Sequence, residues 1–134
     1  MNETSKKCCY FAVFLTLTIL LFSCAHAPTS EEIQSADYGP YPDNYEDVIK
    51  SYYSRSLFDP YSAIYTFDMS PRKGWASGMS GASYGWVVCG TLNGKNRYGG
   101  YVGAKPIYVM IRYGSVAMAE EGYLANSYCS KAGR

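Results

Sequence analysis

Few side chains in the larger, C-terminal part of this chain are suited to acid–base or nucleophilic chemistry. The single histidine, His26, lies in a polar segment that precedes the predicted domain. Ser-His-Asp and Cys-His catalytic arrangements need an imidazole base, and the usual zinc sites need Cys and His ligands. The sequence therefore excludes these sites from the predicted domain.

Three groups of neighbouring carboxylates remain as candidates for a hydrolase that uses two carboxyl groups. The first group lies in the polar segment, the second is placed to cap a helix, and the third has the pattern of a solvated turn. None of them predicts a catalytic pair, so we expect no enzyme activity, no cofactor and no metal site. The groups are Glu31/Glu32, Asp43/Glu46/Asp47 and Glu120/Glu121.

Two stretches that combine glycine with aromatic and basic residues are the candidate binding loops. Arg72 and Trp75 lie in the first stretch, and Arg97, Tyr98 and Tyr101 lie in the second. Exposed aromatic side chains next to arginine are enriched at interaction hot spots, and glycine lets a backbone approach a partner closely. The alternative is that the aromatic rings fold back over the sheet as a lid on a small core.

The N-terminal stretch has the pattern of a secretory signal. Lys6 and Lys7 precede an apolar run from Cys8 to Phe22, which spans about 22 Å as a helix and is short of a ~30 Å hydrocarbon core. The run ends in Leu21-Phe22-Ser23-Cys24, which resembles the lipobox of bacterial lipoproteins. The alternative cleavage site is Ala25-His26-Ala27, which has the A-x-A pattern that ordinary signal peptidase cleaves.

The lipobox resemblance implies a lipidated Cys24 at the start of the mature chain, carrying diacylglycerol and an amide-linked acyl chain such as palmitate. Two or more acyl chains anchor a protein stably in a membrane. In enteric-type bacteria, Ala25 after the cysteine implies sorting to the outer membrane, with the domain facing the periplasm. We expect a signal peptide over 1–23, a flexible tether over 24–38 and one globular domain over 39–134.

The predicted mature chain is electrically balanced and rich in tyrosine. Removing residues 1–23 leaves ten basic and ten acidic side chains, and the full sequence contains 15 tyrosines. A nucleic-acid-binding domain needs a basic face, so we expect no nucleic-acid partner. Tyrosine combines an apolar ring with a polar hydroxyl, which suits sheets and contact surfaces.

Two cysteines, Cys89 and Cys129, follow Cys24 in the predicted mature chain. The cell envelope outside the inner membrane is oxidising, so we expect them to form a disulfide. The alternative is a buried free thiol at Cys89 and a loose one at Cys129.

The predicted fold is α+β, with one N-terminal amphipathic helix packed on a small antiparallel sheet of three to four strands. Asp43 and Glu46 have the spacing of a capping box, and apolar residues then recur at helical spacing. The expected elements are a helix over 45–57 with an apolar face of Tyr45, Val48, Ile49 and Tyr52, a mobile loop over 70–83, strands over 63–67, 84–92, 107–111 and 116–118, and a short helical turn within 120–129.

Further segments resemble a family of small uncharacterised proteobacterial lipoproteins, a resemblance that implies no particular activity. It rests on Pro42-Asp43-Asn44-Tyr45, Asp59-Pro60-Tyr61-Ser62-Ala63 and 84–101, and covers about two-thirds of the chain. The sequence thus predicts a non-enzymatic envelope lipoprotein that is anchored to a membrane by lipid and binds or supports an envelope protein. The alternative is a periplasmic inhibitor or ligand-binding lipoprotein, with a role similar to that of lysozyme inhibitors.

Overall fold

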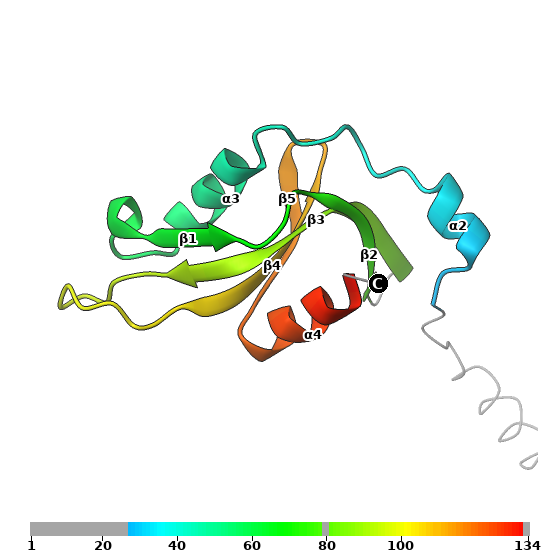
Figure 1. Ribbon diagram of the computed structural model, residues 1–134. Helices are drawn as coiled ribbons and strands as arrows, with labels where there is room; N and C mark the ends of the chain where they lie inside the picture. Colours follow the sequence, from blue (N-terminus) through cyan, green and yellow to red (C-terminus); the bar gives the residue numbers. More distant parts are fainter. Residues whose placement is uncertain (1–26, 79–80, 133–134) are drawn as a thin grey trace, which may run out of the picture.

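The computed structural model describes residues 27–78 and 81–132, so the predicted signal peptide and Cys24 lie outside the described residues. The described chain forms an antiparallel sheet with helices on both of its faces (Figure 1). Its elements are α2 (Ser30–Ser35), α3 (Tyr45–Ser54), the 3₁₀ helix η1 (Pro60–Ser62), β1 (Ile64–Phe67), β2 (Arg72–Gly78), β3 (Gly81–Asn93), β4 (Lys105–Arg112), β5 (Ser115–Glu121) and α4 (Tyr123–Ala132).

The long strand β3 organises the sheet. β4 pairs along one edge of β3, and β5 pairs with β4. The other edge of β3 is shared, because β1 pairs with its C-terminal part and β2 with its N-terminal part. The resulting order is β1-β3-β4-β5, with β2 beside β3.

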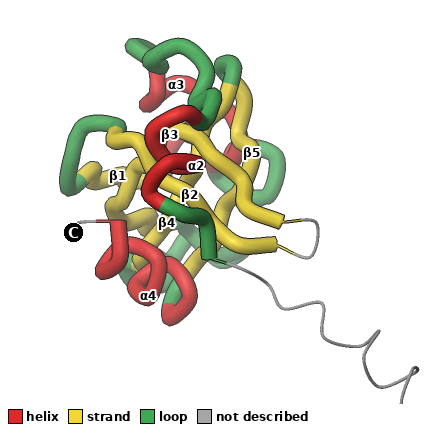
Figure 2. Tube along the Cα trace, turned by 90° about the vertical axis from the view of Figure 1, so that its right-hand side faces the viewer, coloured by secondary structure: helices red, strands yellow, loops and turns green. Residues whose placement is uncertain are grey.

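The two faces of the sheet carry separate hydrophobic clusters. One face packs against α3, where Ile49 and Tyr53 meet Val88 and Val109 of the sheet. The opposite face packs against α4 and includes Tyr108. Figure 2 shows α3 and α4 on opposite sides of the strands. The sheet is therefore the middle layer of a three-layer domain.

The predicted fold class is wrong. Instead of one N-terminal helix on three or four strands, the described chain has a five-stranded antiparallel sheet, with helices over 45–54 and 123–132, and is dominated by sheet. The extra strand β2 and the start of β3 occupy the predicted mobile loop. A full helix, α4, follows β5 where only a short turn was expected.

The glycines of the β2–β3 hairpin led to the prediction of a loop, whereas the structure has paired strands there. A Cβ added at Gly74 would lie 2.5 Å from Val87 Cγ2, and one at Gly85 would lie 2.6 Å from Met110 Cγ. Glycine is therefore required here by close packing between strands rather than by a loop conformation.

The predicted apolar helix face is confirmed, but the predicted capping box is not present. Ile49 is fully buried, and the other residues of the predicted face pack against the same cluster. The N-cap is Asn44, whose side chain makes no capping hydrogen bond, and Glu46 instead pairs with Lys50 at 3.0 Å. The helix ends at Ser54, one turn before the predicted end.

The predicted tether contains ordered structure in its described part. Thr29 and Glu32 form a capping box at the start of α2. Tyr38 is buried, its hydroxyl donates to the Ile33 carbonyl at 2.8 Å, and the Trp86 indole N–H donates to the Gly39 carbonyl at 3.0 Å. The Tyr38 ring also packs edge-on against the Tyr84 ring of β3, with 5.8 Å between the ring centres, so the end of the predicted tether lies against the sheet.

The predicted disulfide is present. Cys89 on β3 and Cys129 on α4 are bonded, with their Cα atoms 5.9 Å apart. The bond joins α4 to the sheet face opposite α3. Within the described residues, no helix has both the length and the apolar character needed to cross a membrane.

Candidate functional site

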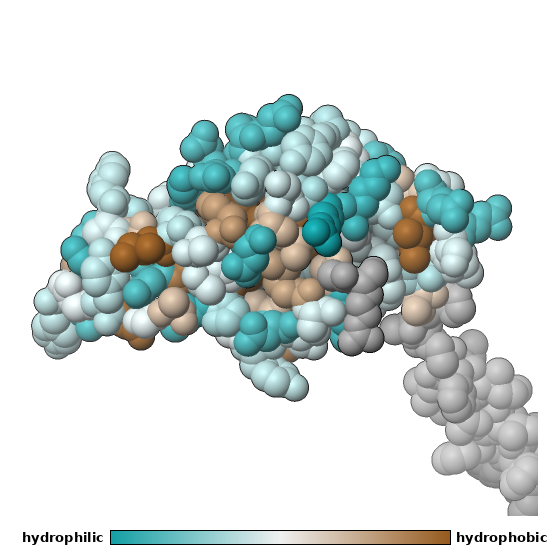
Figure 3. Space-filling view, viewed as in Figure 1, coloured by the Kyte–Doolittle hydropathy of each residue, from teal (hydrophilic) through white to brown (hydrophobic). Residues whose placement is uncertain are grey.

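Exposed aromatic and aliphatic side chains gather at the end of the molecule formed by η1, the start of β1 and the β3–β4 loop. In Figure 1 this end lies opposite α2, and Figure 3 shows hydrophobic patches on it. Exposed apolar clusters commonly mark interaction sites. We call this group the distal aromatic surface; it consists of Phe58, Tyr61, Ile64, Tyr98, Tyr101 and Val102.

The β3–β4 loop has a defined backbone conformation. Lys95 and Tyr101 form a β-bridge, and the amide of Asn96 donates to the carbonyl of Gly100 at 2.8 Å. The Asn96 side-chain oxygen accepts from the backbone N–H groups of Tyr98, at 2.9 Å, and Gly100, at 3.1 Å. The asparagine therefore closes the tip of the loop and fixes the backbone at Tyr98.

Two contacts attach the loop to η1 and its N-cap, and a third lies within the loop. The Tyr101 hydroxyl donates to the Ser62 carbonyl at 2.9 Å. Lys95 Nζ lies 3.8 Å from a carboxylate oxygen of Asp59 and 5.2 Å from the centre of the Tyr101 ring. Hydrogen bonding by Ser62, assisted by Lys95, lowers the pKa of Asp59, so this carboxylate remains charged at neutral pH.

The second candidate binding loop is exposed to solvent. Tyr98 is 88 % exposed and Tyr101 is 47 % exposed, so their rings do not form the alternative lid over the core. Arg97 is exposed beside them. Because a loop whose backbone is already fixed has less entropy to lose on binding, this arrangement suits recognition of another surface.

The first candidate loop lies elsewhere. Arg72 is exposed and Trp75 half-buried on β2, where Trp75 is directly opposite Tyr84 of β3. In Figure 1, β2 is near α2, away from the β3–β4 loop. The structure therefore does not bring the two candidate loops together.

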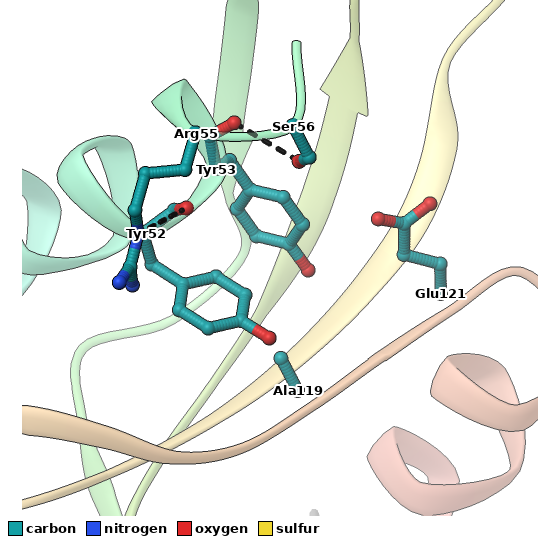
Figure 4. Close-up of a pocket in the computed structure, with 6 residues that line it drawn as sticks. All are labelled: Tyr52, Tyr53, Arg55, Ser56, Ala119 and Glu121. Carbon is teal, nitrogen blue, oxygen red and sulfur yellow. Dashed lines mark hydrogen bonds between the residues drawn. The ribbon is translucent and has the colours of Figure 1, made fainter.

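A hollow between α3 and β5 was missed by the sequence reasoning. It has a volume of about 350 Å³. Figure 4 shows the Tyr53 hydroxyl and the Glu121 carboxylate pointing into it from its two sides. The helical spacing of Tyr53 from Ile49 was a readable signal of its burial. The lining residues are Tyr52, Tyr53, Arg55, Ser56, Ala119 and Glu121.

A polar cluster joins the N-terminal segment to the β4–β5 turn. The Asp37 carboxylate accepts a hydrogen bond from the Tyr113 hydroxyl and pairs with Arg112 at 3.3 Å. The Tyr113 hydrogen bond is the largest of the effects that lower the pKa of Asp37, and the same bond raises the pKa of Tyr113. This cluster holds the segment before α3 in place.

Comparison with known proteins gave no match to a family model, a curated protein or a solved structure. Among residues 27–78 and 81–132, no group of His, Cys, Asp and Glu side chains is arranged to hold a metal ion.

Proposed function

We propose that this protein is a lipid-anchored protein of the bacterial envelope that binds another envelope protein through the distal aromatic surface. The observation that carries the proposal is the cluster of exposed apolar side chains on an ordered scaffold. Solvent-exposed apolar area is costly in water, and burial against a partner recovers about 25 cal/mol per Å² of that area. We propose no catalytic activity.

Two further features support an envelope location. The lipobox-like Leu21-Phe22-Ser23-Cys24 follows an apolar stretch of signal-peptide length. The bond between Cys89 and Cys129 is typical of compartments outside the reducing cytoplasm. Within the proposal, the outer membrane is the destination and the periplasm is the side that the domain faces.

The position of the surface suits an anchored protein. The described chain begins beside α2, at the opposite end of the molecule from the distal aromatic surface (Figure 1). A lipid anchor at Cys24 would therefore present this surface away from the membrane that holds the protein. A partner in the periplasm or in the opposite membrane would be within reach.

Photo-crosslinking in intact cells tests the proposal. A photoreactive phenylalanine analogue replaces Tyr98 in the full chain, with the lipobox retained. We expect one dominant protein adduct, which is lost when Tyr61 and Tyr101 are also changed to alanine. The absence of a protein adduct at Tyr98 would overturn the proposed binding role.

A probe at Tyr123 provides the matched control. Tyr123 is 85 % exposed, close to the 88 % of Tyr98, but it lies at the start of α4 outside the distal aromatic surface. The same adduct with equal yield at both positions would indicate random collision and would contradict the proposal. An adduct confined to Tyr98 would support specific binding.

A further inference from the structure

We propose that the hollow between α3 and β5 binds a single ammonium group on a short aliphatic stem, held by the Tyr53 hydroxyl and the Glu121 carboxylate. The amine is either a small free molecule or the side chain of a lysine in a partner protein. Both sources present the same cationic group and the same apolar stem.

The first observation is a buried hydroxyl without a hydrogen-bond partner. Tyr53 is only 2 % exposed, and its hydroxyl oxygen contacts no donor or acceptor in the structure. Buried polar groups are almost always satisfied, so such an atom calls for an explanation. Figure 4 shows this hydroxyl directed from α3 towards the hollow and the side of Glu121.

The second observation is a carboxylate that faces the same space. Glu121 is opposite Ile107 in the β4–β5 register, which places its side chain on the α3 side of the sheet. Its carboxylate makes no ion pair with any described residue. Lys105 lines an adjoining hollow together with Glu121 without pairing with it, so the carboxylate remains available to an external cation.

The electrostatics at the inner end of the hollow favour a cation. Burial, followed by the charge of Glu121, raises the pKa of Tyr53 far above its usual value. The phenol therefore stays neutral and its oxygen can accept a hydrogen bond from an ammonium N–H. The hollow also lies beside the C-terminal end of α3, where the helix dipole attracts positive charge.

The other residues that line the hollow favour a ligand with an aliphatic stem and a single charge. The ring of Tyr52 and the methyl group of Ala119 provide apolar surface for an aliphatic stem. The Arg55 guanidinium is held over the Tyr52 ring, 5.3 Å from its centre, and adds positive charge to the lining of the hollow. A second cationic group on the ligand would be repelled there, so a monoamine fits better than a diamine.

The adjoining hollow connects this site to the surface already described. It has a volume of about 380 Å³, shares Ser56 and Glu121 with the first hollow, and is lined by Phe58 and Val102 of the distal aromatic surface. A lysine of a protein bound at that surface could therefore extend into the ammonium site. The inference itself rests on the hollow and does not require the proposed function.

The test is a titration of the isotope-labelled full chain with n-butylammonium, followed by NMR at the amides of Ser56, Ala119 and Glu121. n-Butanol is the neutral control of similar shape. We expect saturable shifts with the amine and none with the alcohol. Equal responses to both compounds, or no response to the amine, would overturn the proposal.

Two variants examine the assigned groups, and a third is their control. Glu121→Gln should weaken amine binding about tenfold or more, because it removes a charge-assisted hydrogen bond. Tyr53→Phe should weaken it by a smaller factor while leaving the fold intact. Glu46→Gln removes a carboxylate already paired with Lys50 at the other end of α3 and should leave binding unchanged.

Comparison of two ligands separates the sources of the amine. Nα-acetyl-lysine methylamide reproduces a lysine within a protein, whereas n-butylammonium reproduces a free amine. Tighter binding of the lysine derivative supports insertion of a partner's lysine, and tighter binding of the small amine supports a free ligand. Unchanged amine shifts in Glu121→Gln would overturn the site, whatever the crosslinking at Tyr98 shows.

Discussion

Removal of the disulfide should cost this domain a large part of its stability. The change is the double substitution Cys89→Ala and Cys129→Ala. The bond closes a loop with a sequence separation of 40 residues. In the chain-entropy description, a closed loop of this length stabilises the folded state by about 4 kcal/mol, since it restricts the unfolded chain.

The loss should be concentrated in α4. Besides Cys129, the contacts of this helix with the sheet come from small or half-buried side chains, Ala125 and Ala132 among them, and from Tyr128, whose ring lies 5.1 Å from that of Tyr108. Without the bond, these contacts alone must hold the last helix of the described chain. We therefore expect amide exchange in α4 to accelerate more than exchange in β3 or β4.

Urea unfolding and thermal melting measure the magnitude. A loss of about 4 kcal/mol lowers the melting temperature of a domain of this size by roughly 15 °C. The total stability of small domains is about 5–15 kcal/mol, so the variant should remain folded only narrowly. Wild-type protein treated with reductant should reproduce the result, since it loses the bond without losing side chains.

The matched control is Ser130→Ala, next to Cys129 on α4. Ser130 is exposed, and its hydroxyl bonds only within the helix, to the Ser127 carbonyl, so stability should change by less than about 0.5 kcal/mol. A loss below about 1 kcal/mol in the double cysteine variant would refute the reasoning. Unchanged amide exchange in α4 would refute the part assigned to this helix.

Three other changes have defined outcomes. Gly90→Ala should lower the free energy of unfolding by about 3 kcal/mol or prevent folding, because the added Cβ would lie 2.1 Å from the Thr66 carbonyl oxygen. Urea titration measures the loss, and an unchanged unfolding midpoint would contradict the prediction. Asp37 has a lowered pKa in the folded state, so its contribution to stability is present above its ordinary pKa and is lost as pH falls through the lower folded value. The difference in unfolding free energy between wild type and Asp37→Asn should therefore shrink from pH 5 towards pH 2, roughly the acid range of such groups. A difference that stays constant over this range would exclude the role. Tyr53→Phe should leave the unfolding free energy unchanged or raise it by about 1 kcal/mol, because the substitution removes an unpaired buried hydroxyl. A clear loss of stability without added amine would show that the hydroxyl is paired in the folded protein.

Local patterns in the sequence were sufficient for the α3 face and the central strands. Ile49 and its neighbours recur at helical spacing, and burial confirms that face. The apolar run from Ile107 to Ile111 predicts a strand covered on both faces, and each of these residues is buried between α3 and α4. In both cases the residues that decide the structure are close together in the sequence.

The β2–β3 hairpin was not predictable in the same way. Gly74 and Gly85 oppose one another across the two strands, and each lies against a large side chain of the neighbouring structure. In the sequence, a glycine that makes room for Val87 or Met110 cannot be distinguished from a glycine that allows a turn. The difference lies in the tertiary packing, which composition does not contain.

The ammonium site depends on an irregularity that no alternating pattern would predict. Val116 is opposite Ile111 and faces α3, whereas Met118 is opposite Met110 and faces α4. Residues two apart in a regular strand share a face, so the intervening Ala117 is a bulge, consistent with the register shift at this point. Regular alternation from Val116 would direct Glu120 towards α3 and Glu121 away from it. The bulge reverses this assignment and places the unpaired carboxylate of Glu121 opposite the unpaired hydroxyl of Tyr53.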